Sequence, residues 1–501
     1  MVYREPRRDP SGELSARGAR DCTRSREANA RAMWRSSGLR SRLGRVPIAW
    51  VVEHANYLFL WFLFAWLKLV AFSGKTPVYT GDKRIWATIA EAPLFSREFL
   101  LGRRPLVYPL LFKAGLSDPE IIRLQVLLSI LSQGLLAYAL TRFVSRAFAP
   151  LIFVAVLLLG VVTPVNVWDL LIRAESTSNA LLTTAIASAL LFCRALPEKR
   201  WAMLACALLT ATFGTAAAFA RDTNPYIVLL LALMVVTVAW LAWREWLAPH
   251  RRRFWVIGAL AVWLASACFA AQWTARAAPR YDFPLMNVIF TRILPHVAKR
   301  TYFVDELGMP MSQKLMSRSG KVASSDRSFA YREPRLQPFR EWIFTRGYSS
   351  YQRYLLSHLE ESSLEAYAAF ATVAGYTPRL GASASKTALT EFADEWLVSG
   401  PLKTYPLGAC VGILIVGVVG LVQRRVDTRI LGATSSCLVL ATLSQLFVCF
   451  HGDSMDVSRH TVTVGILLRL AAVVACGVAL NLVASGLSYL KRRLRRQLQI
   501  S

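Results

Sequence analysis

The stretch HANYLFLWFLFAWLKLVAF at residues 54–72 decides the fold class, and similar apolar blocks recur along the rest of the chain. A helix needs about 20 mostly apolar residues to cross a bilayer, and a chain in hydrocarbon has to satisfy its backbone hydrogen bonds internally. The later blocks are long enough, and they cover 120–141, 147–164, 176–195, 201–220, 225–243, 254–275, 405–422, 429–450 and 461–485. The pattern predicts an all-α integral membrane protein with about ten transmembrane helices.

The composition also favours a membrane protein. Of the 501 residues, 54% are hydrophobic, and the mean hydropathy is +0.38. A formal net charge of +28 would indicate nucleic-acid binding in a soluble protein. Here the basic residues gather between apolar blocks, where they set the orientation of a membrane protein. We therefore expect contact with membrane lipids and no nucleic-acid partner.

The placement of basic residues predicts the orientation of the chain. Lys and Arg are enriched in cytoplasmic loops. Alternate connections and both ends of this chain are basic, at 1–50, 142–146, 194–200, 244–253, 424–429 and 491–496. We expect both termini in the cytoplasm and the protein in the cytoplasmic (inner) membrane, with its active side extracytoplasmic.

The same pattern divides the chain into four parts. Residues 1–50 are rich in Arg, Ser, Gly and Ala without a recurring apolar face, which predicts a disordered basic cytoplasmic tail. Residues 51–276 form a membrane domain with spans one to seven and a long first outer loop at 73–118. Residues 277–404 are polar and long enough for one extracytoplasmic domain. Residues 405–501 hold spans eight to ten and a basic cytoplasmic end.

The outer connections collect charged residues that suit phosphate chemistry. The first outer loop carries TGDKRIW from Thr80, with Asp82, Lys83 and Arg84, and later RRPLVYPLLF with Arg103 and Arg104. These cations lie in a predicted outer loop, where the positive-inside pattern makes Lys and Arg uncommon. Binding of an anionic substrate would explain why the loop contains them. The other outer connections supply Asp169, Arg173, Glu175, Arg221, Asp453, Asp456, Arg459 and His460. We expect these connections to converge on one membrane face.

These pieces, in this order, resemble the GT-C superfamily of polytopic glycosyltransferases, which holds protein O-mannosyltransferases and bacterial aminoarabinose transferases. The matching motifs are GDKRIW at 81–86, RPLVYPLL at 104–111, AESTSNALL at 174–182 and RDTNPY at 221–226. The resemblance covers roughly 54–245. It implies inverting transfer of a sugar from a polyprenyl-phosphate donor to a glycan, lipid or protein acceptor.

The resemblance implies a role for each candidate residue. Asp82 matches the family's general base, which takes the proton from the acceptor hydroxyl, and Glu175 is the second catalytic candidate. A leaving phosphate needs cations placed in advance. The candidates for that task are Lys83, Arg84, Arg103, Arg104, Arg173 and Arg221. The cofactor is unknown: a divalent cation is compatible with the chemistry, but no ligand spacing predicts a metal site.

Each assignment has a simpler alternative. Asp82 and Glu175 can be ordinary helix N-caps, and Arg103 and Arg104 can reach toward lipid headgroups. The last outer connection, with Asp453, Arg459 and His460, can be polar only because it is a loop. Arg469 lies about 12 Å inside the last span, where a charge indicates function unless it pairs with a group such as Gln445.

Two other functions remain open for the whole protein. One is a transporter or flippase of a lipid-linked glycan, whose outer charges bind phosphate without chemistry. The other is a non-catalytic scaffold that uses residues 277–404 to bind partners. A transporter should show paired charges at the midplane and a repeat. The sequence shows one deep arginine and no repeat, which favours the enzyme.

The orientation generates the first prediction. A cysteine introduced at Ser325, in the predicted extracytoplasmic domain, should react with a membrane-impermeant maleimide in intact cells. The chain's own cysteines mostly lie in or beside apolar blocks, and the unsubstituted protein measures their background. Labelling that appears only after lysis would contradict the orientation.

Overall fold

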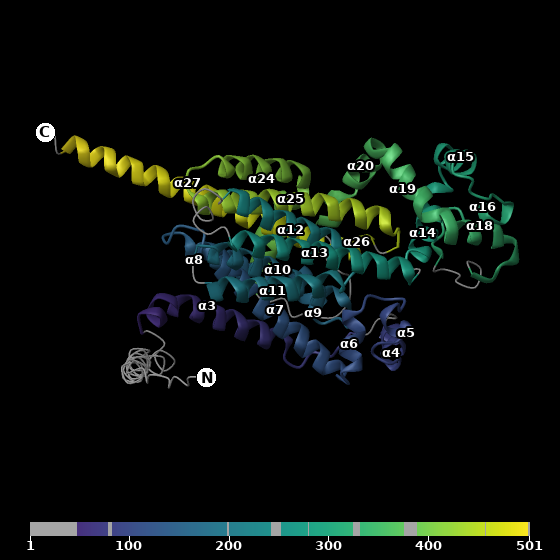
Figure 1. The fold of residues 1–501 in the computed structure, drawn as a ribbon, viewed down its shortest axis with the longest axis horizontal. Helices are drawn as coiled ribbons and strands as arrows, with labels where there is room; N and C mark the ends of the chain where they lie inside the picture. Colours follow the sequence, from purple (N-terminus) through teal and green to yellow (C-terminus); the bar gives the residue numbers. More distant parts are fainter. Residues whose placement is uncertain are drawn as a thin grey trace, which may run out of the picture. The chain divides into compact units, whose positions relative to one another are not determined.

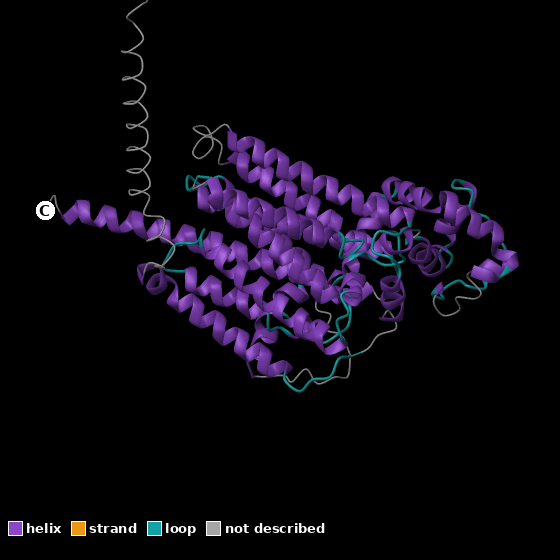
Figure 2. Ribbon diagram, turned by 60° about the horizontal axis from the view of Figure 1, so that its bottom comes forward, coloured by secondary structure: helices purple, strands orange, loops and turns teal. Residues whose placement is uncertain are grey.

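The computed structural model describes residues 48–78, 83–197, 200–241, 252–278, 280–323, 331–374, 388–455 and 457–498. The helices in these ranges show the all-α architecture that the sequence predicts (Figure 2). From Trp61 onward the chain packs as one compact unit, and every contact reported below lies inside it. Most of the predicted tail at 1–50, together with Asp82, Ser325 and Asp456, lies outside the described residues.

Eight described helices are long and apolar enough to cross a membrane. They are α3 (Ile48–Phe72), α7 (Asp118–Thr141), α10 (Ala174–Ala195), α11 (Arg200–Ala218), α12 (Asn224–Leu241), α13 (Arg252–Ala277), α25 (Val426–Gly452) and α27 (Val462–Leu498) (Figure 1). The pair α8 (Ala149–Leu159) and α9 (Thr163–Asp169) meets at a bend of 52° and makes a ninth if it counts as one span. A further apolar helix, α24 (Pro406–Leu421), is shorter. The architecture is that of a helical membrane protein, and the number of ten spans stays a prediction.

The bend between α8 and α9 breaks a block that the sequence predicts as a single span. Pro164 lies in the first turn of α9, and proline lacks the N–H that would continue a helix from α8. The side-chain amide of Asn166 donates to the carbonyl of Val161 at 2.8 Å, and Asp394 accepts from the backbone N–H of Thr163 at 2.8 Å. These bonds satisfy polar groups that the break leaves open.

Helix α10 lies at the centre of the bundle. Most of its residues are buried, and it packs against α7, α11 and α12. Its sequence, AESTSNALLTTAIASALL, is rich in Ala, Ser and Thr, which let neighbouring backbones approach closely. By contrast, α3 and α13 expose large apolar side chains such as Phe62, Trp66, Trp263 and Trp273, as helices that face lipid do.

The backbones of helices α24 and α25 approach each other closely. A methyl group on Gly432 of α25 would lie 2.5 Å from the carbonyl oxygen of Gly417 in α24, so only glycine fits there. Gly420 meets the same point of α25, where its added methyl would lie 3.1 Å from the Gly432 Cα. Small residues therefore set the distance between these two helices.

The loop at 73–118, which the sequence predicts to be the first outer loop, is folded into short helices, namely α4 (Lys83–Glu91), α5 (Arg97–Leu100) and α6 (Val107–Lys113). Trp86 of α4 packs edge-on against Tyr108 of α6, with ring centroids 4.5 Å apart. The Tyr108 hydroxyl donates to Gln125 of α7 at 2.8 Å. Before α4, the backbone of Val78 pairs with that of Leu171 in an isolated parallel β-bridge. Both ends of the loop are thus attached to the bundle.

The region 282–404 has a hydrophobic core of its own, in which aliphatic side chains pack with aromatic ones such as Phe290, Phe303, Trp342 and Tyr354. We call this region the polar lobe. Its described helices are α14 (Asp282–Val288), the π-helix η3 (Ile289–Ile293), α15 (Val297–Asp305), α16 (Gln313–Met316), the 3₁₀-helix η5 (Pro334–Leu336), α18 (Gln337–Trp342), the π-helix η6 (Ile343–Gly347), α19 (Tyr348–Ser357), α20 (Leu359–Ala368), α21 (Phe370–Ala374), α22 (Ala388–Leu397) and α23 (Pro401–Thr404). The lobe follows α13 and precedes α24 (Figure 1).

Buried polar side chains attach the lobe to the bundle. His451, near the end of α25, donates from Nε2 to the carbonyl of Ser362 at 2.9 Å and accepts at Nδ1 from the Tyr351 hydroxyl at 3.1 Å. Arg469 of α27 donates to backbone carbonyls of Leu397 at 2.5 Å and of Ala374 at 2.8 Å. These bonds hold the last part of the lobe against α27.

Candidate functional site

Three connections meet at one end of the bundle and form a cluster that we call the arginine cluster. It consists of Glu175, Arg221, Arg459 and His460, with Arg104 and Arg173 close by. Glu175 Oε1 lies 3.4 Å from Arg459 Nε and 3.8 Å from Arg221 Nη2. Arg221 Nη2 also lies 3.1 Å from His460 Nδ1. One carboxylate therefore holds together guanidinium groups from the α11–α12 and α25–α27 connections.

The positions of these residues follow from the local folding. Glu175 occupies the first turn of α10, where the partial positive charge of the helix N-terminus favours a carboxylate. Arg221 lies in the turn before α12, which Asn224 closes by donating to Ser178 and to the carbonyl of Ala217, both at 2.8 Å. The adjacent Thr223 accepts from Gln445 of α25 at 2.9 Å. Gln445 thus orients the Arg221 turn.

The helix that carries Arg459 and His460 is α26 (Val457–His460), between α25 and α27. The His460 carbonyl accepts from the Cys449 thiol at 3.1 Å. On the following helix, the Thr463 hydroxyl donates to Asn179 of α10 at 2.9 Å. These contacts bring the α25–α27 connection to the start of α10, where Glu175 lies.

His460 is held in its neutral form. Burial lowers its pKa well below the usual range, and the charges of Arg459, Arg221, Arg104 and Arg173 lower it further. A neutral imidazole has one acceptor nitrogen. Arg221 and Arg459 approach opposite ring nitrogens, at 3.1 and 3.3 Å, so the ring accepts from one of them at a time. Four guanidinium groups thus act on this ring, and two of them, from Arg221 and Arg459, contact it directly.

The burial of the cluster makes it suitable for an anion. Arg221 is 7% exposed and Glu175 is 5% exposed. Within the described residues, the buried Nη1 of Arg221 has no hydrogen-bond partner. A buried donor that is left unpaired costs free energy, which an incoming anionic oxygen would recover. The arrangement can bind a phosphate or carboxylate group at this end of the bundle.

The first-loop cations separate in space. Arg104 is half-buried and acts on the pKa of His460, whereas its neighbour Arg103 is exposed. Lys83 forms an ion pair with Asp118 at the start of α7, and Arg84 is exposed. Asp82 lies outside the described residues. Of the predicted phosphate-binding residues, Arg104, Arg173 and Arg221 are those whose charges act on the pKa of His460.

The remaining predicted polar residues take different places. Asp453 accepts from Asn287 of the polar lobe at 3.0 Å, and its Oδ2 lies 3.9 Å from His460 Nε2. Arg469 contacts backbone carbonyls of the lobe, and Gln445, considered as its partner from the sequence, bonds to Thr223. In the described part of the chain, no group of three or more His, Cys, Asp or Glu side chains is arranged to hold a metal ion.

A second polar group lies beside the cluster, and sequence reasoning missed its key member, Lys68. The Lys68 ammonium lies 2.8 Å from Asp169 Oδ2, with both side chains almost fully buried. It also donates to the Ser129 hydroxyl at 2.8 Å and to the Gly160 carbonyl at 2.7 Å. The sequence did contain a signal for this pair, because a lysine inside an apolar block, such as Lys68 within 54–72, indicates a buried partner.

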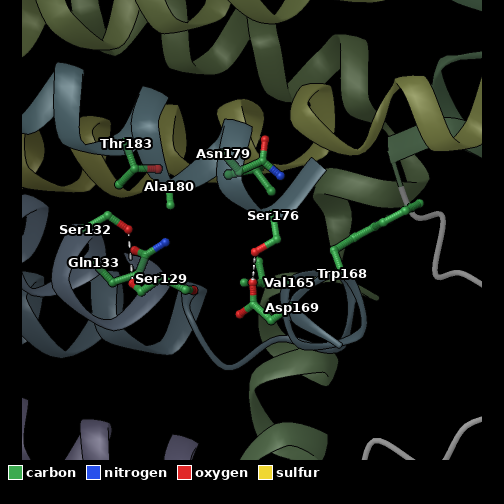
Figure 3. Close-up of a pocket in the computed structure, with 11 residues that line it drawn as sticks. Ser129, Ser132, Gln133, Val165, Trp168, Asp169, Ser176, Asn179, Ala180 and Thr183 are labelled. Carbon is green, nitrogen blue, oxygen red and sulfur yellow. Dashed lines mark hydrogen bonds between the residues drawn. The ribbon is translucent and has the colours of Figure 1, made fainter. Parts of the chain in front are cut away.

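A small cavity adjoins this ion pair (Figure 3). Its volume is about 20 Å³, which is room for roughly one water molecule. Ser129, Ser132, Gln133 and Thr183 line it, and Ser176 on its wall donates to Asp169 (Figure 3). Since Ser176 follows Glu175 in α10, the ion pair and the arginine cluster share one helix start.

Comparison of the chain with protein-family models, with curated proteins and with solved structures finds no match. The functional argument therefore depends on the geometry of the two clusters and on the sequence motifs.

The buried ion pair generates a stability prediction. Replacing Lys68 with Met should leave Asp169 buried without its cation, and breaking a buried ion pair in this way typically costs about 3–5 kcal/mol. The double variant Lys68→Met/Asp169→Asn removes both charges and should regain most of that loss. Unfolding of the purified variants in detergent measures the difference. A single variant as stable as the unsubstituted protein would show that the pair carries no stability.

Proposed function

We propose that the chain is a membrane glycosyltransferase that moves a sugar from a polyprenyl-phosphate donor to an acceptor, with inversion. The observation that carries the proposal is the buried arginine cluster at the end of the transmembrane-length helices. A lipid-linked phosphate lies at the level where such helices end, and guanidinium groups pair well with phosphate oxygens. The order of the motifs, which resembles the GT-C superfamily, supports the same conclusion.

The proposed reaction requires a base and a site for the leaving phosphate. The acceptor oxygen attacks the anomeric carbon while the bond from that carbon to the phosphate oxygen breaks, and the electron pair of this bond stays on the phosphate. Arg104, Arg173 and Arg221 bind the phosphate and stabilise its growing charge. The base, Asp82 by its motif, takes the proton of the acceptor hydroxyl.

Glu175 has a positioning role in this proposal. It is an ion-pair partner of both Arg221 and Arg459, so its carboxylate orients the guanidinium groups that bind phosphate. His460 accepts a hydrogen bond within the same cluster and, being neutral, adds no further positive charge. We place this site on the extracytoplasmic side of the inner membrane, from the basic residues in the opposite connections.

A transporter or flippase of a lipid-linked glycan is the second candidate, and one observation favours it. Lys68 and Asp169 form a buried ion pair beside a polar cavity, a feature of transport pathways. Lys68 is four residues from the end of α3, about 6 Å along the helix, so the pair lies near the arginine cluster and far from the middle of the span. That position suits support of the cluster better than transport.

The first test separates two adjacent arginines. Arg104→Ala should weaken the binding of polyprenyl phosphate by about ten- to hundredfold, because a charge-assisted contact contributes roughly 1.5–3 kcal/mol. Arg103→Ala removes the same charge from an exposed position and serves as the matched control. The dissociation constants are measured with purified protein in nanodiscs. Equal effects of the two substitutions would mean that the half-buried position of Arg104 has no special role.

The second test concerns catalysis. Asp82→Asn keeps the shape of the side chain but cannot take the proton, so turnover should fall about 10²–10⁴-fold with donor affinity nearly unchanged. Release of labelled sugar from the polyprenyl-phosphate donor is the measurement. If Asp82 only caps a helix, Asn is an equally good cap and activity survives. A transporter would release no sugar in either form, which distinguishes the two candidate functions.

A further inference from the structure

A second basic region lies at the other end of the bundle, far from the arginine cluster along α25 and α27. It is a cavity of about 890 Å³ between the α24–α25 connection and the last part of α27. Five cationic side chains line it, and no carboxylate does so among the described residues. The lining cations are Arg424, Arg425, Lys491, Arg492 and Arg495. We call this cavity the basic groove.

The length of α27 carries its last part, which forms one wall of the groove, beyond the end of the bundle. The 37 residues of α27 span about 55 Å, whereas the hydrocarbon core of a bilayer is about 30 Å thick. The side-chain amide of Asn481 donates to the carbonyl of Phe143, in the α7–α8 connection, at 2.9 Å. It also lies 3.4 Å from the hydroxyl of Thr428, in the first turn of α25, so Asn481 marks where the bundle ends. After Asn481, α27 continues past the neighbouring helices (Figure 1).

This last part of α27 is amphipathic. Leu487, Leu490, Leu494 and Leu498 recur at helical spacing, and all are exposed. The groove is lined from the other side of the same helix by Ser485, Ser488, Arg492 and Arg495. A helix with an apolar stripe and a basic polar face, emerging where a span ends, has the pattern of an interfacial segment. Its groove side then lies at the level of lipid headgroups.

We propose that the basic groove binds the headgroup of an anionic membrane phospholipid. The arginine and lysine side chains contact the phosphate, and Val422 and Leu482, the apolar residues of the lining, contact the first part of the acyl chains. The combination of basic and apolar walls selects an amphiphile over a soluble anion. This site is independent of the proposed sugar transfer, since the groove and the arginine cluster lie at opposite ends of α27.

The test compares two pairs of arginines on one helix. Arg492→Gln/Arg495→Gln removes two groove cations, and Arg493→Gln/Arg496→Gln removes two cations of the same exposed segment that do not line the groove. Delipidated full-length protein is titrated with phosphatidylglycerol or phosphatidylcholine, and bound lipid is counted by native mass spectrometry. Because the four altered residues are exposed, both variants should fold. Thermal unfolding of each purified variant checks this.

The expected result is one tightly bound phosphatidylglycerol in the unsubstituted protein and in the Arg493/Arg496 variant. Affinity should fall about tenfold or more in the Arg492/Arg495 variant, because each basic residue near an anionic headgroup contributes to binding. An equal loss of phosphatidylglycerol affinity in the two variants would mean that the lipid is attracted by net positive charge and not bound in the groove, and it would overturn the proposal. Equal binding of phosphatidylcholine, or displacement of the lipid by millimolar inorganic phosphate, would overturn the lipid assignment.

Discussion

The ion pair between Lys68 and Asp169 is the interaction on which the cluster end of the bundle depends. Lys68 extends from α3 and contacts α7 through Ser129, the α8–α9 bend through Gly160, and α9 through Asp169. The bend leaves the Gly160 carbonyl without its continuing helical partner, and the lysine satisfies it. Hydrocarbon offers no hydrogen bonds, so a broken helix inside a membrane needs such a donor from within the protein. The bend, the lysine and the aspartate are therefore parts of one arrangement.

The same arrangement fixes the start of α10. The side-chain amide of Gln125 donates to the Asp169 and Leu171 carbonyls at 3.2 and 2.9 Å, and the backbone of Leu171 pairs with that of Val78 in the loop at 73–118. Arg173 and Glu175 follow directly. The loop at 73–118 and α7 are thus attached to the short stretch of chain that leads into α10. The arginine cluster forms at that point, and Glu175 supplies a negative charge among its arginines.

The two basic regions differ in burial, and the difference indicates different ligands. In the arginine cluster, guanidinium groups lie beside a carboxylate and a neutral imidazole with little contact to solvent, where electrostatic interactions are strong. In the basic groove the cations are exposed, and no carboxylate lines it within the described residues. The buried arginine cluster suits a specific phosphate whose charge changes in a reaction. The second suits a headgroup that is already anionic and present in excess.

The sequence by itself determined the fold class, because runs of about twenty apolar residues have few other stable forms. Each of the ten predicted blocks overlaps a described helix or the bent pair α8–α9. It also identified Arg104, Arg173, Glu175, Arg221, Arg459 and His460 as residues of interest. Only the tertiary structure showed that Glu175, Arg221, Arg459 and His460 are in contact and that the charges of Arg104 and Arg173 act on His460. It also showed that Lys83 pairs with Asp118 while Arg84 and Arg103 are exposed, since a charge pattern does not reveal which side chain turns inward. It alone paired Lys68 with Asp169, because the partner of a buried charge is chosen by helix packing, over a separation of about a hundred residues that no local pattern records.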